Sequence, residues 1–138
     1  MNTAMAKTLT ALFLSAAFLM LMMTSCMSDE EKRLDNLVNI EKKEMPKDFG
    51  YDVKAVNVTY STTDSLVTYT MEVEPGMIAS TLEHTGALLK QGIIISIKTD
   101  ENNEFREAVI GAGASIKYNF FSDGKELTSF VITPDELK

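Results

Sequence analysis

The sequence contains a single cysteine, Cys26, a single histidine, His84, and no tryptophan. One cysteine excludes a disulfide bond within the chain, and a structural zinc site needs about four converging ligands, mostly Cys and His. Basic residues are also scarce, because 13 Lys and Arg stand against 20 Asp and Glu, for a formal net charge of −7. Such an acidic chain is repelled by phosphate backbones. We therefore expect no metal site and no nucleic-acid partner.

The one long hydrophobic stretch, at residues 9–23, follows Lys7 near the start of the chain. A positive charge, a short apolar stretch and then small residues form the pattern of a secretion signal, whereas a membrane-spanning helix needs roughly 20 apolar residues. Thr24 and Ser25 supply the small residues before the cleavage site. The pattern predicts a signal peptide at residues 1–25 and a mature chain that begins at Cys26.

The residues at the cleavage site, Met23-Thr24-Ser25-Cys26, resemble a lipobox, the motif of small residues followed by cysteine in bacterial lipoproteins. Met23 departs from the Leu that is usual at the first position. The resemblance implies a diacylglycerol thioether on Cys26, which makes a membrane the partner of the mature N-terminus. Because one acyl chain alone binds a bilayer only reversibly, lasting attachment takes two or three chains. We expect a lipid-anchored protein of the outer membrane, facing either the cell surface or the periplasm.

An acidic run, Asp29-Glu30-Glu31, follows the cysteine closely. It fits a solvated tether between lipid and domain. It also resembles the surface-export signal of lipoproteins from one group of Gram-negative gut anaerobes. We divide the chain into a signal peptide at residues 1–25, an acidic tether at residues 26–33 and a single domain at residues 34–138, a length that can bury one modest core.

The first half of the domain reads as a short helix and a hairpin. Residues 34–45 have the spacing of an amphipathic helix, which Pro46 ends. Residues 53–60 are rich in β-branched and aromatic side chains, and we expect Val56 and Val58 on one face of a strand. Residues 67–73 alternate strictly between apolar and polar, which predicts the partner strand with one buried face.

The second half reads as two helices and another hairpin. Apolar residues recur every three or four positions over residues 77–98, which predicts a helix, although the β-branched segment 92–98 also fits a strand. A further helix is expected at residues 104–112, and a closing hairpin at residues 114–133 around the turn Ser122-Asp123-Gly124-Lys125.

These elements predict an α+β fold. Both hairpins would merge into one antiparallel sheet, with the helix pair at about residues 77–112 packed on one face and a short N-terminal helix beside it. The expected inward-facing residues are Val67, Tyr69, Met71, Val73, Leu82, Leu89, Ile93, Phe105, Val109, Ile116, Tyr118 and Ile132.

The order of elements is similar to that of a family of small secreted or lipid-anchored proteins of unknown function from the same gut anaerobes. Three segments carry the resemblance: Ala114–Tyr118, Asp123–Leu127 and Thr133–Leu137. Met45-Pro46 stands where that family has Cys-Pro, so the cysteine is missing here. Since the family has no assigned activity, the resemblance implies the fold and transfers no site residue.

No pattern in the sequence marks a catalytic or cofactor site. His84 has no second histidine to work with, and we expect it on an exposed helix surface. Glu72 and Glu74 share a strand face, and paired carboxylates can do acid–base work, but the solvated face of a sheet explains them more simply. Gly111-Ala112-Gly113 lacks the third glycine of a dinucleotide loop and follows a helix instead of opening one. We therefore expect no cofactor.

Aromatic residues gather in the closing hairpin at Tyr118, Phe120, Phe121 and Phe130. They fit a core shared by two facing strands, and they also fit a binding platform.

One residue of the first hairpin's turn is a candidate for modification. Asp64-Ser65-Leu66 resembles the acceptor of O-glycosylation in the same bacterial group, which would make Ser65 the modified residue. Taken together, the sequence favours a non-enzymatic binding or interaction lipoprotein whose partner is a protein or a glycan. The alternative is a small enzyme with a carboxylate-based site.

Overall fold

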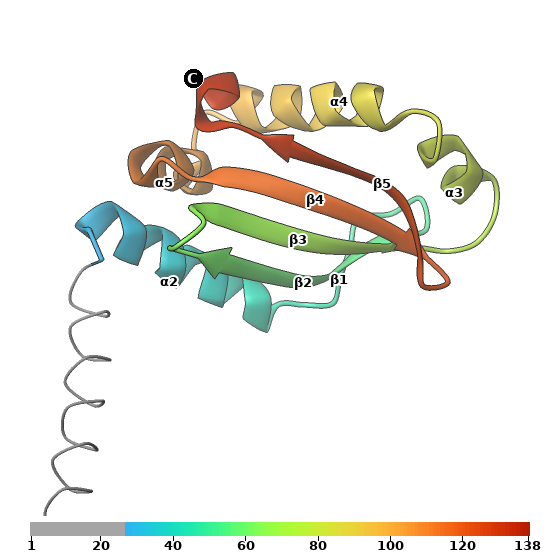
Figure 1. Ribbon diagram of the computed structural model, residues 1–138, viewed down its shortest axis with the longest axis horizontal. Helices are drawn as coiled ribbons and strands as arrows, with labels where there is room; N and C mark the ends of the chain where they lie inside the picture. The colour runs from blue at the N-terminus through green and yellow to red at the C-terminus, as the bar shows by residue number, and fades with distance from the viewer. Residues whose placement is uncertain (1–26) are drawn as a thin grey trace, which may run out of the picture.

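The computed structural model describes residues 27–138, and its ribbon is shown in Figure 1. The expected signal peptide and Cys26 lie outside the described residues. In chain order the elements are α2 (Asp29–Lys43), β1 (Lys47–Asp48), β2 (Val53–Ser61), β3 (Leu66–Val73), α3 (Met77–Leu82), α4 (Gly86–Thr99), α5 (Glu104–Ala112), β4 (Ser115–Ser122), β5 (Lys125–Ile132) and a closing 3-10 turn η1 (Pro134–Leu137). Among these residues no helix has both the length and the apolar character to cross a membrane.

The sheet has five strands in the order β1-β2-β3-β4-β5, and both expected hairpins are present. The two hairpins meet through β3 and β4, which run parallel, with Tyr69 opposite Tyr118. The prediction of a wholly antiparallel sheet is therefore wrong at this one pairing. The reason lies in the connection: three helices carry the chain from the end of β3 back to the level where β3 began, so β4 starts in the same direction.

The helix expected over residues 77–98 is broken into α3 and α4. The segment 92–98 is helical, which decides between the helix and strand interpretations. The break precedes Gly86, where Thr128 of β5 comes so close that a side chain on residue 86 would collide with it. Glycine thus lets α4 begin directly against the edge strand.

The first helix begins earlier than the sequence suggested. Ser28 accepts a hydrogen bond from the backbone of Glu31 at 3.1 Å, and the Glu31 carboxylate accepts one from the backbone of Ser28 at 3.4 Å. This capping box starts α2 at Asp29, with acidic residues in its first turn and Lys42 and Lys43 in its last, as the helix dipole favours. Residues 29–33, assigned to a tether from the sequence, are therefore helical.

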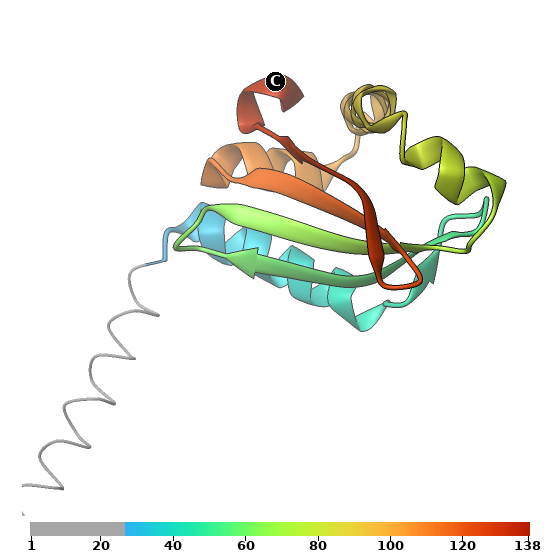
Figure 2. The ribbon, with the colours of Figure 1, turned by 45° about the vertical axis from the view of Figure 1, so that its right-hand side comes forward.

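All twelve residues expected to face inward belong to the core or pack against it. Seven are buried, and the half-buried five are Leu82, Leu89, Ile93, Phe105 and Tyr118. In β2 a bulge between Ala55 and Asn57 shifts the alternation, so Ala55 joins Val58 inside while Val56 is only half-buried. Both ribbon views place α2 along β2 and α4 beyond β5, at opposite edges of the sheet (Figures 1 and 2).

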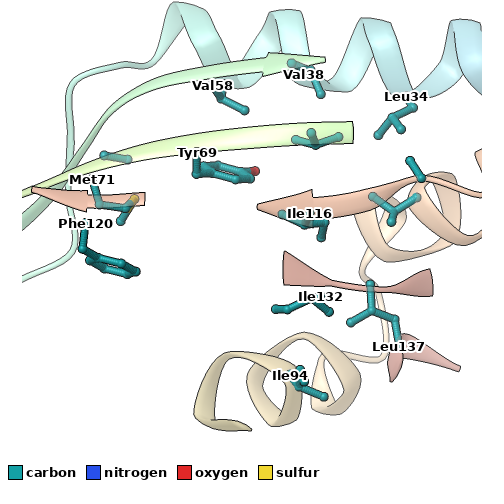
Figure 3. Close-up of a cluster of buried hydrophobic side chains, with 14 of the residues drawn as sticks. Leu34, Val38, Val58, Tyr69, Met71, Ile94, Ile116, Phe120, Ile132 and Leu137 are labelled. Carbon is teal, nitrogen blue, oxygen red and sulfur yellow. The ribbon is translucent and has the colours of Figure 1, made fainter. Parts of the chain in front are cut away.

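The core itself has two parts (Figure 3). The first part contains four fully buried side chains: Leu34 of α2, Ile116, Ile132, and Leu137 of η1. Helix α5 packs against both α2 and η1 above them. We call this the closed end. Tyr69, Met71 and Phe120 lie farther along the same face, and we call that part the open end.

Candidate binding groove

A groove of about 340 Å³ runs over the open end, between α2 and α4. Its floor consists of side chains from the middle strands β3 and β4: Tyr69, Met71, Tyr118 and Phe120. Its α4 wall is formed by Leu89, Ile93, Ser96 and Ile97, and Glu41, Phe49 and Val53 complete the lining. The volume lies at the lower end of the range for ligand pockets, enough for a few side chains.

The floor is an aromatic cluster. The rings of Tyr69 and Tyr118 stack with centroids 5.0 Å apart and an interplanar angle of 8°. Phe130 tilts against Tyr118 at 5.6 Å, and Phe105 of α5 meets Tyr69 edge to face at 6.2 Å. The parallel register places the two tyrosines side by side, so the parallel pairing of β3 with β4, which was not predicted from the sequence, creates the floor. Tyr118 and Phe120 belong to the core cluster and also line the groove, so a binding platform stays a prediction for them, while Phe121 lies on the opposite face of the sheet.

The α4 wall is unusually apolar for a helix with so little cover. Ile94 is the one buried residue of α4, whereas Leu88 and Ile95 are 74% and 60% exposed. A helix that is apolar around most of its circumference is normally buried on all sides. Here the main contacts of α4 are with β5 and η1, and its Lys90 forms an ion pair with Glu136 of η1 at 3.0 Å. The apolar side chains with which α4 lines the groove are half-buried, whereas its exposed Leu88 and Ile95 lie outside the groove lining.

Among the described residues, Glu41 is the only charged one in the groove lining. Its side chain is half-buried, and its Oε2 accepts a hydrogen bond of 2.6 Å from the hydroxyl of Tyr69. Within residues 27–138 the Glu41 carboxylate has no lysine, arginine or histidine nitrogen within ion-pair distance. The Lys47 ammonium group instead forms an ion pair with the Glu44 carboxylate at 3.8 Å. It also lies over the ring of Phe49, 5.8 Å from the ring centroid.

Burial and the carboxylate together keep the tyrosines neutral. Desolvation raises the pKa of Tyr69 well above its usual range, and the Glu41 charge and its hydrogen bond raise it further. Desolvation and the same charge also raise the pKa of Tyr118. The two hydroxyls therefore remain hydrogen-bond donors at physiological pH, beside an acceptor that is negatively charged.

A second hollow, of about 640 Å³, lies on the opposite, helix-free face of the sheet. It gathers the carboxylates of Asp48, Asp52, Glu72, Glu74 and Asp123. Glu72 is paired with Lys54 at 3.9 Å, and no group of three His, Cys, Asp or Glu residues in the described part of the chain is placed to hold a metal. This hollow is where the alternative, a carboxylate-based enzyme, would have to work.

The remaining candidates from the sequence are not brought together. Ser65 lies at an exposed position in the turn between β2 and β3, with a positive φ of 49°. His84 is exposed in the turn between α3 and α4. The groove was missed from the sequence, although the apolar residues on all sides of α4 and the aromatics of β4 were its signals.

Comparison with known proteins supports the fold. No protein-family model and no curated protein matches the sequence. Among solved structures, a protein of Pseudomonas aeruginosa classed as secreted is similar, with a TM-score of 0.61 and 14% identity over 81% of this chain and 99% of that one. The type 2 secretion system pilotin EpsS of Vibrio vulnificus has a TM-score of 0.57 and 16% identity over 80% and 96%. The type II secretion system pilotin AspS of Vibrio cholerae has a TM-score of 0.57 and 15% identity over 78% and 92%.

Proposed function

We propose that this chain is a lipoprotein of the outer membrane, anchored through Cys26, that acts as a non-enzymatic interaction module. Its groove would receive the apolar face of a segment from a partner protein. The observation that carries the proposal is the aromatic floor of the groove, which the apolar side chains of α4 wall on one side. An amphipathic helix laid into an apolar groove is a common mode of peptide recognition.

The shape of the groove favours a protein segment over a small metabolite. It is a partly open hollow, not an enclosed cavity, and its floor presents apolar surface with few polar groups to orient a compact ligand. The likeness of the fold to two pilotins of type II secretion systems supports the interaction role that we propose for this chain. The proposal covers both faces of the outer membrane, the cell surface and the periplasmic side. It also includes O-glycosylation of Ser65.

Site-specific photocrosslinking in the cells that produce the protein tests the groove. A photoreactive phenylalanine at Ser96, which lines the groove, is compared with the same residue at Thr59, an exposed residue of β2 that does not line it. We expect one discrete adduct from position 96 and none of that mass from position 59. The same adducts from both positions, or none from position 96, would contradict the proposal.

The anchor is tested separately on protein isolated from the same cells. We expect mass spectrometry to find a mature chain beginning at Cys26 that carries acyl groups, and Cys26→Ala to leave unprocessed or released protein. An unmodified Cys26 would remove the lipid anchor and would leave the groove as a binding site of a protein held in place by other means.

A further inference from the structure

The one charge in the groove has no counter-charge within the described chain. Glu41 lies on α2, and the other ten residues that line the groove are uncharged. Tyr69 donates to Oε2 of Glu41, which leaves Oε1 without a hydrogen bond to any residue in the range 27–138. A half-buried carboxylate beside an aromatic floor is costly to cover with apolar surface alone, because covering it removes its water without supplying a cation.

We infer that Glu41 is a specificity-determining residue that receives a lysine or arginine side chain from the segment bound in the groove. The inference rests on the proposed function and adds the chemistry of the partner: a mainly apolar segment with one cation placed to reach Oε1. Charge complementarity selects this occupant, since an acidic or uniformly apolar segment would bury the carboxylate unpaired.

Tyr69 has a positioning role in this arrangement. Its ring is buried and stacked on Tyr118, so its hydroxyl holds the carboxylate at one side of the groove. An acceptor held in place before binding loses less side-chain entropy when a ligand arrives.

A library of random 16-residue peptides built on a helix-favouring framework and displayed on phage is the probe. It is selected against the full chain held in phosphatidylcholine nanodiscs. Each binder is then tested against Ser96→Trp, which fills the groove from an exposed position on α4 without touching a buried residue. We expect the binders that this variant abolishes to carry a lysine or arginine among apolar residues.

The strongest of these peptides then goes into a double-mutant cycle. Glu41→Gln should weaken its binding about ten- to a hundredfold, which is typical for loss of a charge-assisted hydrogen bond, and replacing the peptide's cation by norleucine should cause the same loss. Combining both changes should cost little more than either. Glu30→Gln, an exposed residue on the first turn of the same helix, is the matched control and should leave affinity unchanged.

The outcomes separate the two proposals. Groove-dependent binders without enriched cations, or with equal affinity for Glu41→Gln, would overturn the role of Glu41 and leave the groove's function intact. Binders indifferent to Ser96→Trp, or no binders at all, would overturn both. The change on the peptide side tests the inference even if Glu41→Gln fails to fold, because it leaves the protein unaltered.

Discussion

The closed and open ends lie on the same face of one sheet, but they differ in the type of side chain they present and in how fully helices cover them. At the closed end, aliphatic side chains of α2, β4, β5 and η1 are fully buried beneath α5. At the open end, aromatic side chains form a floor over which the closest cover is the half-buried wall of α4. The most polar of the long helices, α2, buries Leu34 and Val38, whereas the most apolar, α4, buries Ile94 alone. Apolar residues thus form the core at the closed end and line the proposed interaction surface at the open end.

The largest contrast should appear in stability. Leu34→Ala at the closed end removes a fully buried side chain, and we expect it to lower the free energy of unfolding by about 2–5 kcal/mol. Leu89→Ala at the open end removes a half-buried one and should cost about 1 kcal/mol or less. Urea unfolding of both variants measures the difference. Equal losses would mean that α4 belongs to the core as fully as α2 does.

A smaller effect is expected at the open end, on the way folding stability depends on alkaline pH. The folded state raises the pKa of Tyr69 and Tyr118, so it binds more protons than the unfolded chain once the pH exceeds the unfolded tyrosine pKa of about 10. The stabilisation is complete below that pH and is lost progressively above it. Tyr69→Phe should flatten the decline between roughly pH 10 and 11.5 in thermal melts, relative to the wild type. If the stability of Tyr69→Phe declines as steeply as that of the wild type, groups other than Tyr69 cause the decline.

The smallest effect concerns the ion pair between Lys90 of α4 and Glu136 of η1. The backbone of Thr133 and the side chain of Lys90 lower the pKa of Glu136. The stabilisation that this provides is present above the unfolded glutamate pKa of about 4.3 and is lost as the pH falls through the folded value. Glu136→Gln should therefore be slightly less stable than wild type at pH 7 and equal to it near pH 2. A difference that persists at pH 2 would mean that the side chain acts through packing.

Patterns local in sequence predicted most of the fold. The alternation of residues 67–73 and the helical spacing of residues 104–112 each specify an element and its buried face, and both are confirmed. The parallel pairing of β3 with β4 was missed, since it depends on where three helices return the chain. The bulge in β2 was missed as well, because one extra residue changes which side chains face inward without leaving a mark in composition.

The groove lay beyond local patterns for the same reason. Glu41 and Tyr69 are 28 residues apart in sequence and meet only after α2 has packed along the sheet. The apolar character of α4 was visible, yet periodicity describes which residues are apolar and says nothing of whether a neighbour covers them. The aromatics of β4 were likewise visible, and only the parallel register brought Tyr118 onto Tyr69.

The early start of α2 fixes how far the groove stands from the membrane. With a lipid on Cys26, as proposed, the three residue steps to Asp29 span no more than about 10 Å, and a rigid rod follows at once. Glu41 lies twelve residues along that rod, roughly 18 Å farther on at the rise of an α-helix. The acidic first turn discourages the rod from lying flat on an anionic bilayer. With this anchor, the proposed binding site would lie within roughly 30 Å of the lipid surface, at the end of a short rigid helix. At this distance the groove can bind segments of proteins that are themselves attached to the same membrane. It cannot reach segments that lie farther from the lipid surface.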